Sequence, residues 1–138
     1  MKILIIDGQG GGLGKQLVAA AKERFPQIEV MAVGTNSAAT NSMLRAGADQ
    51  AATGENSVRV ASARTDVIMG PVGIVIADSM LGEITPQMAL AVGQSHAKRI
   101  LIPVNLCDNI VVGVSESSMA KNVQNAMDAL EKLLGQQS

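Results

Sequence analysis

The sequence has almost no aromatic residues. Among 138 residues there is one Phe, and there is no Trp or Tyr. Aromatic rings form the stacking platforms of many single-stranded nucleic-acid sites and supply many hot spots of protein–protein interfaces. Basic charge is not in excess either, because the formal net charge is −1 at pH 7. We therefore expect no nucleic-acid partner and no anionic membrane surface as a partner.

Cysteine and histidine are equally scarce. Cys107 is the only cysteine and His96 the only histidine, so the chain offers no internal disulfide, no zinc site and no Ser-His-Asp arrangement. We interpret Cys107 as a small apolar residue and His96 as a solvated loop residue, and we expect no metal. No apolar run reaches membrane-spanning length, and the short run before Asp7 does not suit a secretory signal. These absences predict a cytoplasmic protein.

The residues that are present are typical of a globular chain. Hydrophobic residues make up 47% of the sequence and charged residues 17%, with no repeat or low-complexity tract. A chain of this length buries about 68% of its unfolded surface without help from a disulfide or a metal. We predict one domain over residues 1–138 and, because so small and apolar a domain tends to bury one face, a homo-oligomer.

Short apolar runs alternate with helical patterns along the chain. Ile3–Ile6 is typical of a strand buried on both faces, and residues 13–25 place apolar side chains on one helical stripe. Further strands are predicted at 30–33, 49–52, 67–69, 100–104 and 110–114, helices at 36–46, 56–64, 85–92 and 119–134, and a buried helical turn or short helix at 74–81. This alternation predicts an α/β fold, a doubly wound, largely parallel Rossmann-like sheet of five to six strands in three layers.

A glycine-rich loop lies between the first predicted strand and the first predicted helix. Five glycines occupy the seven positions from Gly8 to Gly14, which exceeds what a tight turn needs. Glycine lets a ligand approach the bare backbone, and the N-terminus of a helix favours a phosphate. We predict that the loop binds the phosphates of a nucleotide through Gly8, Gln9, Gly10, Gly11, Gly12, Leu13 and Gly14.

The glycine spacing fits two dinucleotide-binding patterns. Gly8, Gly12 and Gly14 give the G-x-x-x-G-x-G loop of the short-chain dehydrogenase/reductases, which this loop resembles, and Gly8, Gly10 and Gly14 give a relative of the standard fingerprint. NAD(P) or another nucleotide is therefore the expected cofactor. The dehydrogenase activity itself is excluded, because that family relies on a Tyr and this chain has none.

A P-loop fits less well. It needs Ser or Thr at position 16 as a magnesium ligand, and the chain has Gln16 there. Residues 11–15 nevertheless resemble the deviant P-loop of the ParA-like ATPases, so ATP binding at a P-loop-like site is an alternative prediction.

The second predicted strand ends without an acidic residue. A dinucleotide site usually has Asp or Glu there to bind the adenosine ribose. This chain has Gly34-Thr35-Asn36-Ser37 instead, and Arg45 lies at least a helical turn further on. We predict that Thr35 and Asn36 contact the nucleotide, although capping of the following helix accounts for Asn36 equally well.

A strand order of 3-2-1-4-5 would place the loop after the fourth strand opposite the glycine loop. We predict that Gly70, Pro71 and Ser79 contact the cofactor, and that Asp78 and Glu83 are weak catalytic candidates as a general acid and base. The alternative is that Asp78 faces solvent or caps a helix end and that Glu83 lies in a surface turn. Second candidates at the strand ends are Glu55, Asn56 and Asn105.

Nearly the whole chain resembles a family of short bacterial proteins, the domain of unknown function 3842. The segments that carry the resemblance are residues 7–12, 34–36, 47–49, 52–56, 70–71, 79–85 and 102–103, together with Asn105 and Cys107. It implies a Rossmann-like fold with a nucleotide site and no particular reaction. The leading hypothesis is thus a nucleotide-binding domain, and the alternative is a small enzyme that uses Asp78, Glu83 or Cys107 on a phosphorylated substrate.

Overall fold

The computed structural model describes residues 1–104 and 108–136, and these residues form five strands, five α-helices and one 3-10 helix. The strands are β1 (Lys2–Asp7), β2 (Glu29–Gly34), β3 (Gln50–Thr53), β4 (Val67–Pro71) and β5 (Lys98–Ile102). The helices are α1 (Gly12–Arg24), α2 (Ser37–Arg45), α3 (Glu55–Ser62), α4 (Pro86–Gln94) and α5 (Met119–Gly135), with the 3-10 helix η1 at Val72–Val75.

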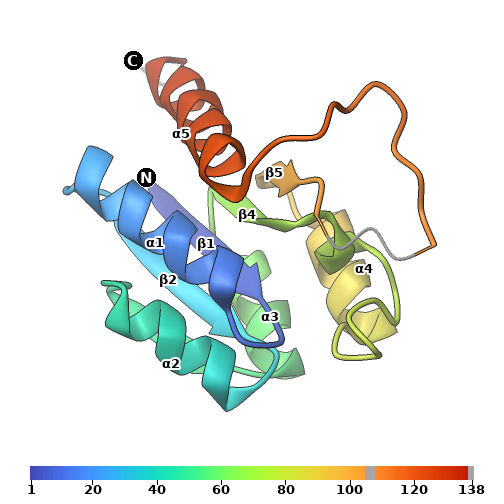
Figure 1. The fold of residues 1–138 in the computed structure, drawn as a ribbon. Coiled ribbons are helices and arrows are strands. Elements are labelled where there is room, and N and C mark those ends of the chain that lie inside the picture. Colours follow the sequence, from blue (N-terminus) through green and yellow to red (C-terminus); the bar gives the residue numbers. More distant parts are fainter. Residues whose placement is uncertain (105–107, 137–138) are drawn as a thin grey trace.

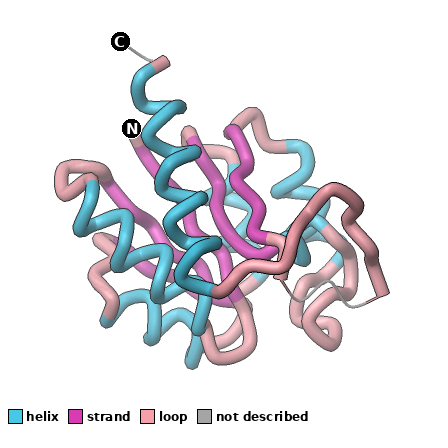
Figure 2. The backbone as a smooth tube through the Cα atoms, turned by 45° about the horizontal axis from the view of Figure 1, so that its top comes forward, coloured by secondary structure: helices cyan, strands magenta, loops and turns pink. Residues whose placement is uncertain are grey.

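All neighbouring strands are parallel, and their order in the sheet is β3-β2-β1-β4-β5. This is the predicted doubly wound arrangement, with the change of direction between β1 and β4. Figure 2 shows the strands side by side, with helices on both faces and a long loop before α5. The predicted α/β Rossmann-like fold is confirmed.

Each face of the sheet has its own apolar core. Ile3 and Ile5 point to the side covered by α1, α2 and α5, whereas Leu4 and Ile6 point to the side covered by α3, α4 and η1. Figure 1 shows these two helical layers on either side of the sheet. Because helices cover both faces of β1, side chains on both faces are apolar, and the strand is a continuous apolar run in the sequence.

The helix ends follow the local signals in the sequence. The Asn36 side chain caps α2 by accepting from Ala39 N at 2.9 Å, and Gly47 after it has a φ of 117°. Thr85 caps α4, whose first residue is Pro86. No helix in the described part of the chain is long and apolar enough to cross a membrane.

The strand predicted at 110–114 is wrong. Residues 110–114 form no strand, and Ile110 and Val112 are 91% and 88% exposed. A strand needs a neighbour to hydrogen-bond with, and within residues 1–104 and 108–136 the sheet ends at β5. The buried helical turn or short helix predicted at 74–81 is present as the turn η1, in which Ile74 is buried. No helix continues from it to residue 81, because Asp78, Met80 and Leu81 have positive φ.

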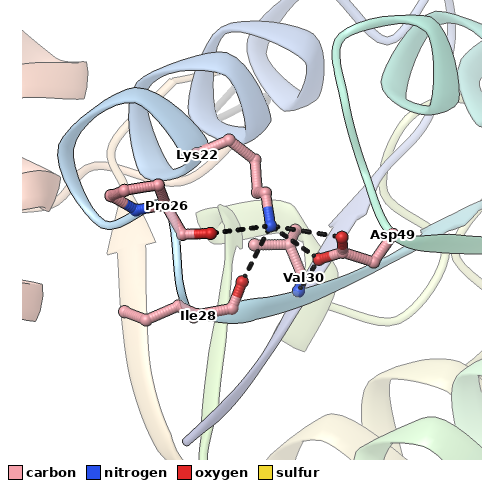
Figure 3. Close-up of polar contacts among 5 residues, drawn as sticks. All are labelled: Lys22, Pro26, Ile28, Val30 and Asp49. Atoms are coloured by element: carbon pink, nitrogen blue, oxygen red, sulfur yellow. Dashed lines mark hydrogen bonds and ion pairs between the residues drawn. The ribbon is translucent and has the colours of Figure 1, made fainter.

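A charged contact ties the elements together at the amino ends of the strands. Lys22 Nζ of α1 lies 2.9 Å from Asp49 Oδ2 and donates to the Ile28 carbonyl at 3.0 Å (Figure 3). The Asp49 carboxylate also accepts from Val30 N at 2.8 Å. That backbone bond and Lys22 hold the pKa of Asp49 below its usual value. These contacts explain Lys22 and Asp49 as structural residues at the edge of the sheet opposite the glycine loop.

Candidate functional site

The carboxyl ends of the strands meet at one edge of the sheet. Asp7 is paired with Gly34, and Gly34 with Thr53, so the loops after β1, β2 and β3 start side by side. The turns after β4 reach the same edge, because Glu83 contacts the loop after β1. The predicted clustering of loops at this edge is confirmed for the described residues.

The glycine loop leaves several backbone donors open. The loop closes on itself through Gly11 N, which donates to the Gly8 carbonyl at 2.9 Å, and Gly11 takes the left-handed φ of 73° that starts α1. The N–H groups of Gly10, Gly12 and Leu13 have no hydrogen-bond acceptor among the described residues. Donors of this kind at a helix N-terminus favour an anionic ligand.

Gly10 and Gly12 are glycines that the fold itself does not require. A Cβ added at either one would have no atom within 4 Å, and neither has a positive φ. Gly8 and Gly14 differ, because a Cβ at Gly8 would lie 2.7 Å from Thr35 Oγ1 and one at Gly14 would lie 2.6 Å from Met43 Sδ. Packing therefore explains Gly8 and Gly14, whereas a Cβ added at Gly10 or Gly12 would face open space.

Asp7 is a buried carboxylate that the sequence analysis did not single out. It is 5% exposed and accepts from Gly8 N at 2.8 Å and from Gly14 N at 2.7 Å. Burial raises the pKa of Asp7, although the two backbone bonds act in the opposite direction and Glu83 adds to the rise. The sequence does carry a signal for Asp7, because an acidic residue directly follows a buried apolar strand and precedes the N-terminus of a helix. Asp7 thus holds the first turn of α1 in place by accepting from Gly14 N.

Glu83 connects the turns after β4, residues 72–85, which we call the facing loop, to the glycine loop. Its Oε1 atom accepts three hydrogen bonds, from Thr35 Oγ1 at 2.6 Å, Gln9 N at 2.8 Å and Asn36 Nδ2 at 2.8 Å. Partial burial acts to raise the pKa of Glu83, but the bonds from Thr35, Gln9 and Asn36 outweigh burial and hold that pKa below its usual value. Glu83 is therefore an ordered, ionised carboxylate at the ends of β1 and β2.

The other predicted residues of the facing loop have separate places. Asp78 is exposed, and its carboxylate makes no hydrogen bond or ion pair with another described residue. The acid–base role of Asp78 and Glu83 stays a prediction. Ser79 is 7% exposed and donates to the Gly73 carbonyl, which closes the turn after η1. Gly70 and Pro71 are buried at the end of β4.

The loop around these residues has unusual backbone conformations. Asp78, Met80 and Leu81 have φ values of 67°, 57° and 57°, and Gln9 in the glycine loop has 51°. Residues other than glycine rarely adopt this region, and such residues cluster at ligand sites. All four residues of this kind in the described part of the chain lie in the glycine loop or in the turns after β4 that contact it.

The remaining candidates lie outside this contact. Glu55 accepts from Thr85 Oγ1 at 2.6 Å, and Asn56 accepts from Arg59 at 2.9 Å. Asn105 and Cys107 lie outside the described residues. His96 is exposed. No group of three or more His, Cys, Asp or Glu that could hold a metal occurs in residues 1–104 and 108–136.

The pKa of Glu83 predicts a stability loss in acid. A carboxyl group whose pKa is lowered by folding stabilises the folded state at every pH above its ordinary pKa, which is 4.5 for Glu83. This stabilisation is lost as pH falls through the lower pKa of the folded state. We expect wild type to exceed Glu83→Gln in free energy of unfolding at about pH 7, and the difference to shrink toward about pH 3. Urea denaturation across this range measures it.

The variant also separates Glu83 from Asp7. The raised pKa of Asp7 gives a stability contribution with the opposite pH dependence, which is present in acid and is lost as pH rises through the folded pKa of Asp7. Both proteins keep Asp7, so its contribution largely cancels in their difference. A difference that stays constant from about pH 7 to about pH 3 would contradict the hydrogen bonds assigned to Glu83.

Comparison with known proteins places the chain in a family. The model of a family described as Domain of unknown function (DUF3842) matches residues 2–135. A search of curated proteins gives no significant match. Among solved structures the chain is similar to the "dodecameric FMN-dependent Ubix-like Decarboxylase from Escherichia coli O157:H7", with 19% identity, coverage of 95% of this chain and 77% of that chain, and a TM-score of 0.48.

Proposed function

The chain belongs to the DUF3842 family, and on this premise we propose that it binds a nucleotide through phosphate contacts at the glycine loop. Gly10, Gly12 and Leu13 are proposed to donate their backbone N–H groups to a phosphate. Thr35 and Asn36 line the same edge of the sheet at the end of β2. The proposal describes a binding domain, and turnover is not part of it.

The observation that carries the proposal is the open space around Gly10 and Gly12. Neither residue has a positive φ or a close neighbour that would exclude a side chain. Glycine loses more conformational freedom on folding than any other residue, so a glycine that neither φ nor packing requires lowers the stability of the fold. A ligand that approaches the backbone is a physical reason to keep glycine at both positions.

NAD(P) is the first cofactor to test, because the spacing of Gly8, Gly10 and Gly14 is a relative of the standard dinucleotide-binding fingerprint. FMN, ATP, GTP and sugar phosphates complete the panel. The proposal extends to a cytoplasmic location and to a homo-oligomer, in which some of the large apolar side chains exposed on the surface, among them Leu81 at 98% and Ile110 at 91%, would be covered.

A melting experiment tests the proposed function. A ligand at about 100 times its dissociation constant adds roughly 2.7 kcal/mol to the free energy of unfolding and raises the melting temperature. We expect such a shift for wild type with at least one nucleotide of the panel. We expect Gly12→Val to fold but to lose the shift, because its side chain would occupy the open space over the loop.

Gly93→Val is the matched control. Gly93 is also a helical glycine with no atom within 4 Å of an added Cβ, and it lies in α4. This variant should keep the full ligand-induced shift. The proposal fails if no compound of the panel shifts wild type, or if Gly12→Val responds as wild type does.

A further inference from the structure

The end of β2 lacks an acid of its own, but the structure places one there from another part of the chain. The Oε1 atom of Glu83 lies 2.6 Å from Thr35 Oγ1 and 2.8 Å from Asn36 Nδ2, the two residues that follow β2. Glu83 is separated from Thr35 by 48 positions in the sequence. In dinucleotide-binding folds an acid at this place binds the hydroxyl groups of the adenosine ribose.

The position of the carboxylate is fixed by the surrounding residues. Oε1 is fully used by its three donors, which come from the loop after β1 and the loop after β2. Gly8 makes this close approach possible, because a Cβ at Gly8 would lie 3.1 Å from Oε1 and 2.8 Å from Met80 Sδ. Asn36 Nδ2 also donates to the Gln9 carbonyl at 2.9 Å, which joins the two loops directly.

The second oxygen of the carboxylate is available to a ligand. No donor in the described part of the chain reaches Glu83 Oε2, and the side chain is half-buried at the surface of the loops. An ionised carboxylate accepts hydrogen bonds and donates none. A group bound by Oε2 must therefore bring a donor, as a hydroxyl does, and a second negative charge at the same place is repelled.

We propose that Glu83 selects the sugar of the bound nucleotide, accepting from its free ribose hydroxyl through Oε2 and rejecting a ribose that carries a 2′-phosphate. This inference rests on the proposed phosphate binding at the glycine loop. It narrows the ligand class to ribonucleotides with a free 2′-hydroxyl, and so to the NAD side of the NAD(P) pair.

Three ligands that differ only at the 2′-position test the inference. They are AMP, 2′-deoxy-AMP and adenosine 2′,5′-bisphosphate, measured by isothermal titration calorimetry together with NAD and NADP. Loss of a hydrogen bond to a charged group changes affinity by about tenfold or more. We expect wild type to bind AMP at least about tenfold more tightly than either 2′-variant, and NAD at least about tenfold more tightly than NADP.

Glu83→Gln assigns the discrimination to this residue. The amide oxygen can keep the three donors of Oε1, while an NH₂ group replaces the free acceptor Oε2. We expect the preference for NAD over NADP to fall by about tenfold in this variant. Asp78→Asn is the matched control in the same loop, where Asn tolerates the φ of 67°. That variant should keep the wild-type preference.

The outcomes separate the two proposals. If AMP and NAD bind with Gly12-dependent affinity but without preference at the 2′-position, the role of Glu83 is overturned and phosphate binding stands. The role of Glu83 is equally overturned if Glu83→Gln keeps the wild-type preference. If neither these ligands nor any compound of the larger panel binds, phosphate binding fails and the role of Glu83 fails with it.

Discussion

Replacement of Gly70 by alanine is expected to lower the free energy of unfolding by about 3 kcal/mol. Gly70 lies in β4 next to the central strand, and a Cβ added there would collide with the Ile6 carbonyl oxygen and lie 3.0 Å from Ile74 Cδ1. The carbonyl belongs to the backbone of β1, which is held by strands on both sides and has little room to move. Urea denaturation of Gly70→Ala and wild type measures the loss.

The control for this prediction is Gly93→Ala. Nothing lies within 4 Å of a Cβ at Gly93, and the residue is helical, so alanine should stabilise the protein by about 0.5–1 kcal/mol. A Gly70→Ala protein as stable as wild type would show that β4 does not approach β1 as closely as described. Gly70 is also a predicted cofactor contact, and its close approach to β1 is a packing reason for glycine at this position.

Replacement of Asp7 by alanine is the second large effect. The change removes the acceptor of two backbone donors, Gly8 N and Gly14 N, at a residue that is 5% exposed. A buried donor left without a partner costs about 1–3 kcal/mol, so we expect a loss of about 3 kcal/mol or more. Asp7→Asn retains one acceptor oxygen and should lose about half as much. Chemical denaturation of the three proteins at one pH measures the series.

Asp66→Ala is the corresponding surface control. Asp66 also accepts from a backbone donor, Lys2 N at 2.8 Å, but this bond is exposed to solvent. Water can replace the lost acceptor there, so the expected change is within about 0.5 kcal/mol. Equal losses in Asp7→Ala and Asp66→Ala would contradict the burial of the Asp7 contacts.

The features that were predicted correctly depend on neighbours in the sequence. The apolar run of β1, the Asn36 cap and the Thr85-Pro86 start of α4 are each set by a few adjacent residues. The observed strand order is the 3-2-1-4-5 order of doubly wound nucleotide-binding folds, which the sequence analysis took as its working arrangement. Such local and topological rules apply before any side-chain contact is known.

The features that were missed depend on distant residues. Glu83 was recognised as a polar group near the site, but its partners Gln9 and Thr35 lie 74 and 48 positions away. No periodicity in the sequence encodes such a contact. The strand predicted at 110–114 failed for a related reason, because an apolar run of β-branched residues indicates a strand only where a neighbouring strand is available.

The central place of β1 has a consequence for synthesis of the chain. β1, β2 and β3 are all complete once Thr53 has left the ribosome, and they can pair while later residues are still being added. The other edge of β1 stays unpaired until Val67–Met69 follows. Glu83 emerges later still, so the nascent chain passes through a stage in which the glycine loop is formed but its facing loop is missing. Translation speed between Thr53 and Met69 thus sets how long one edge of the central strand is exposed to other proteins.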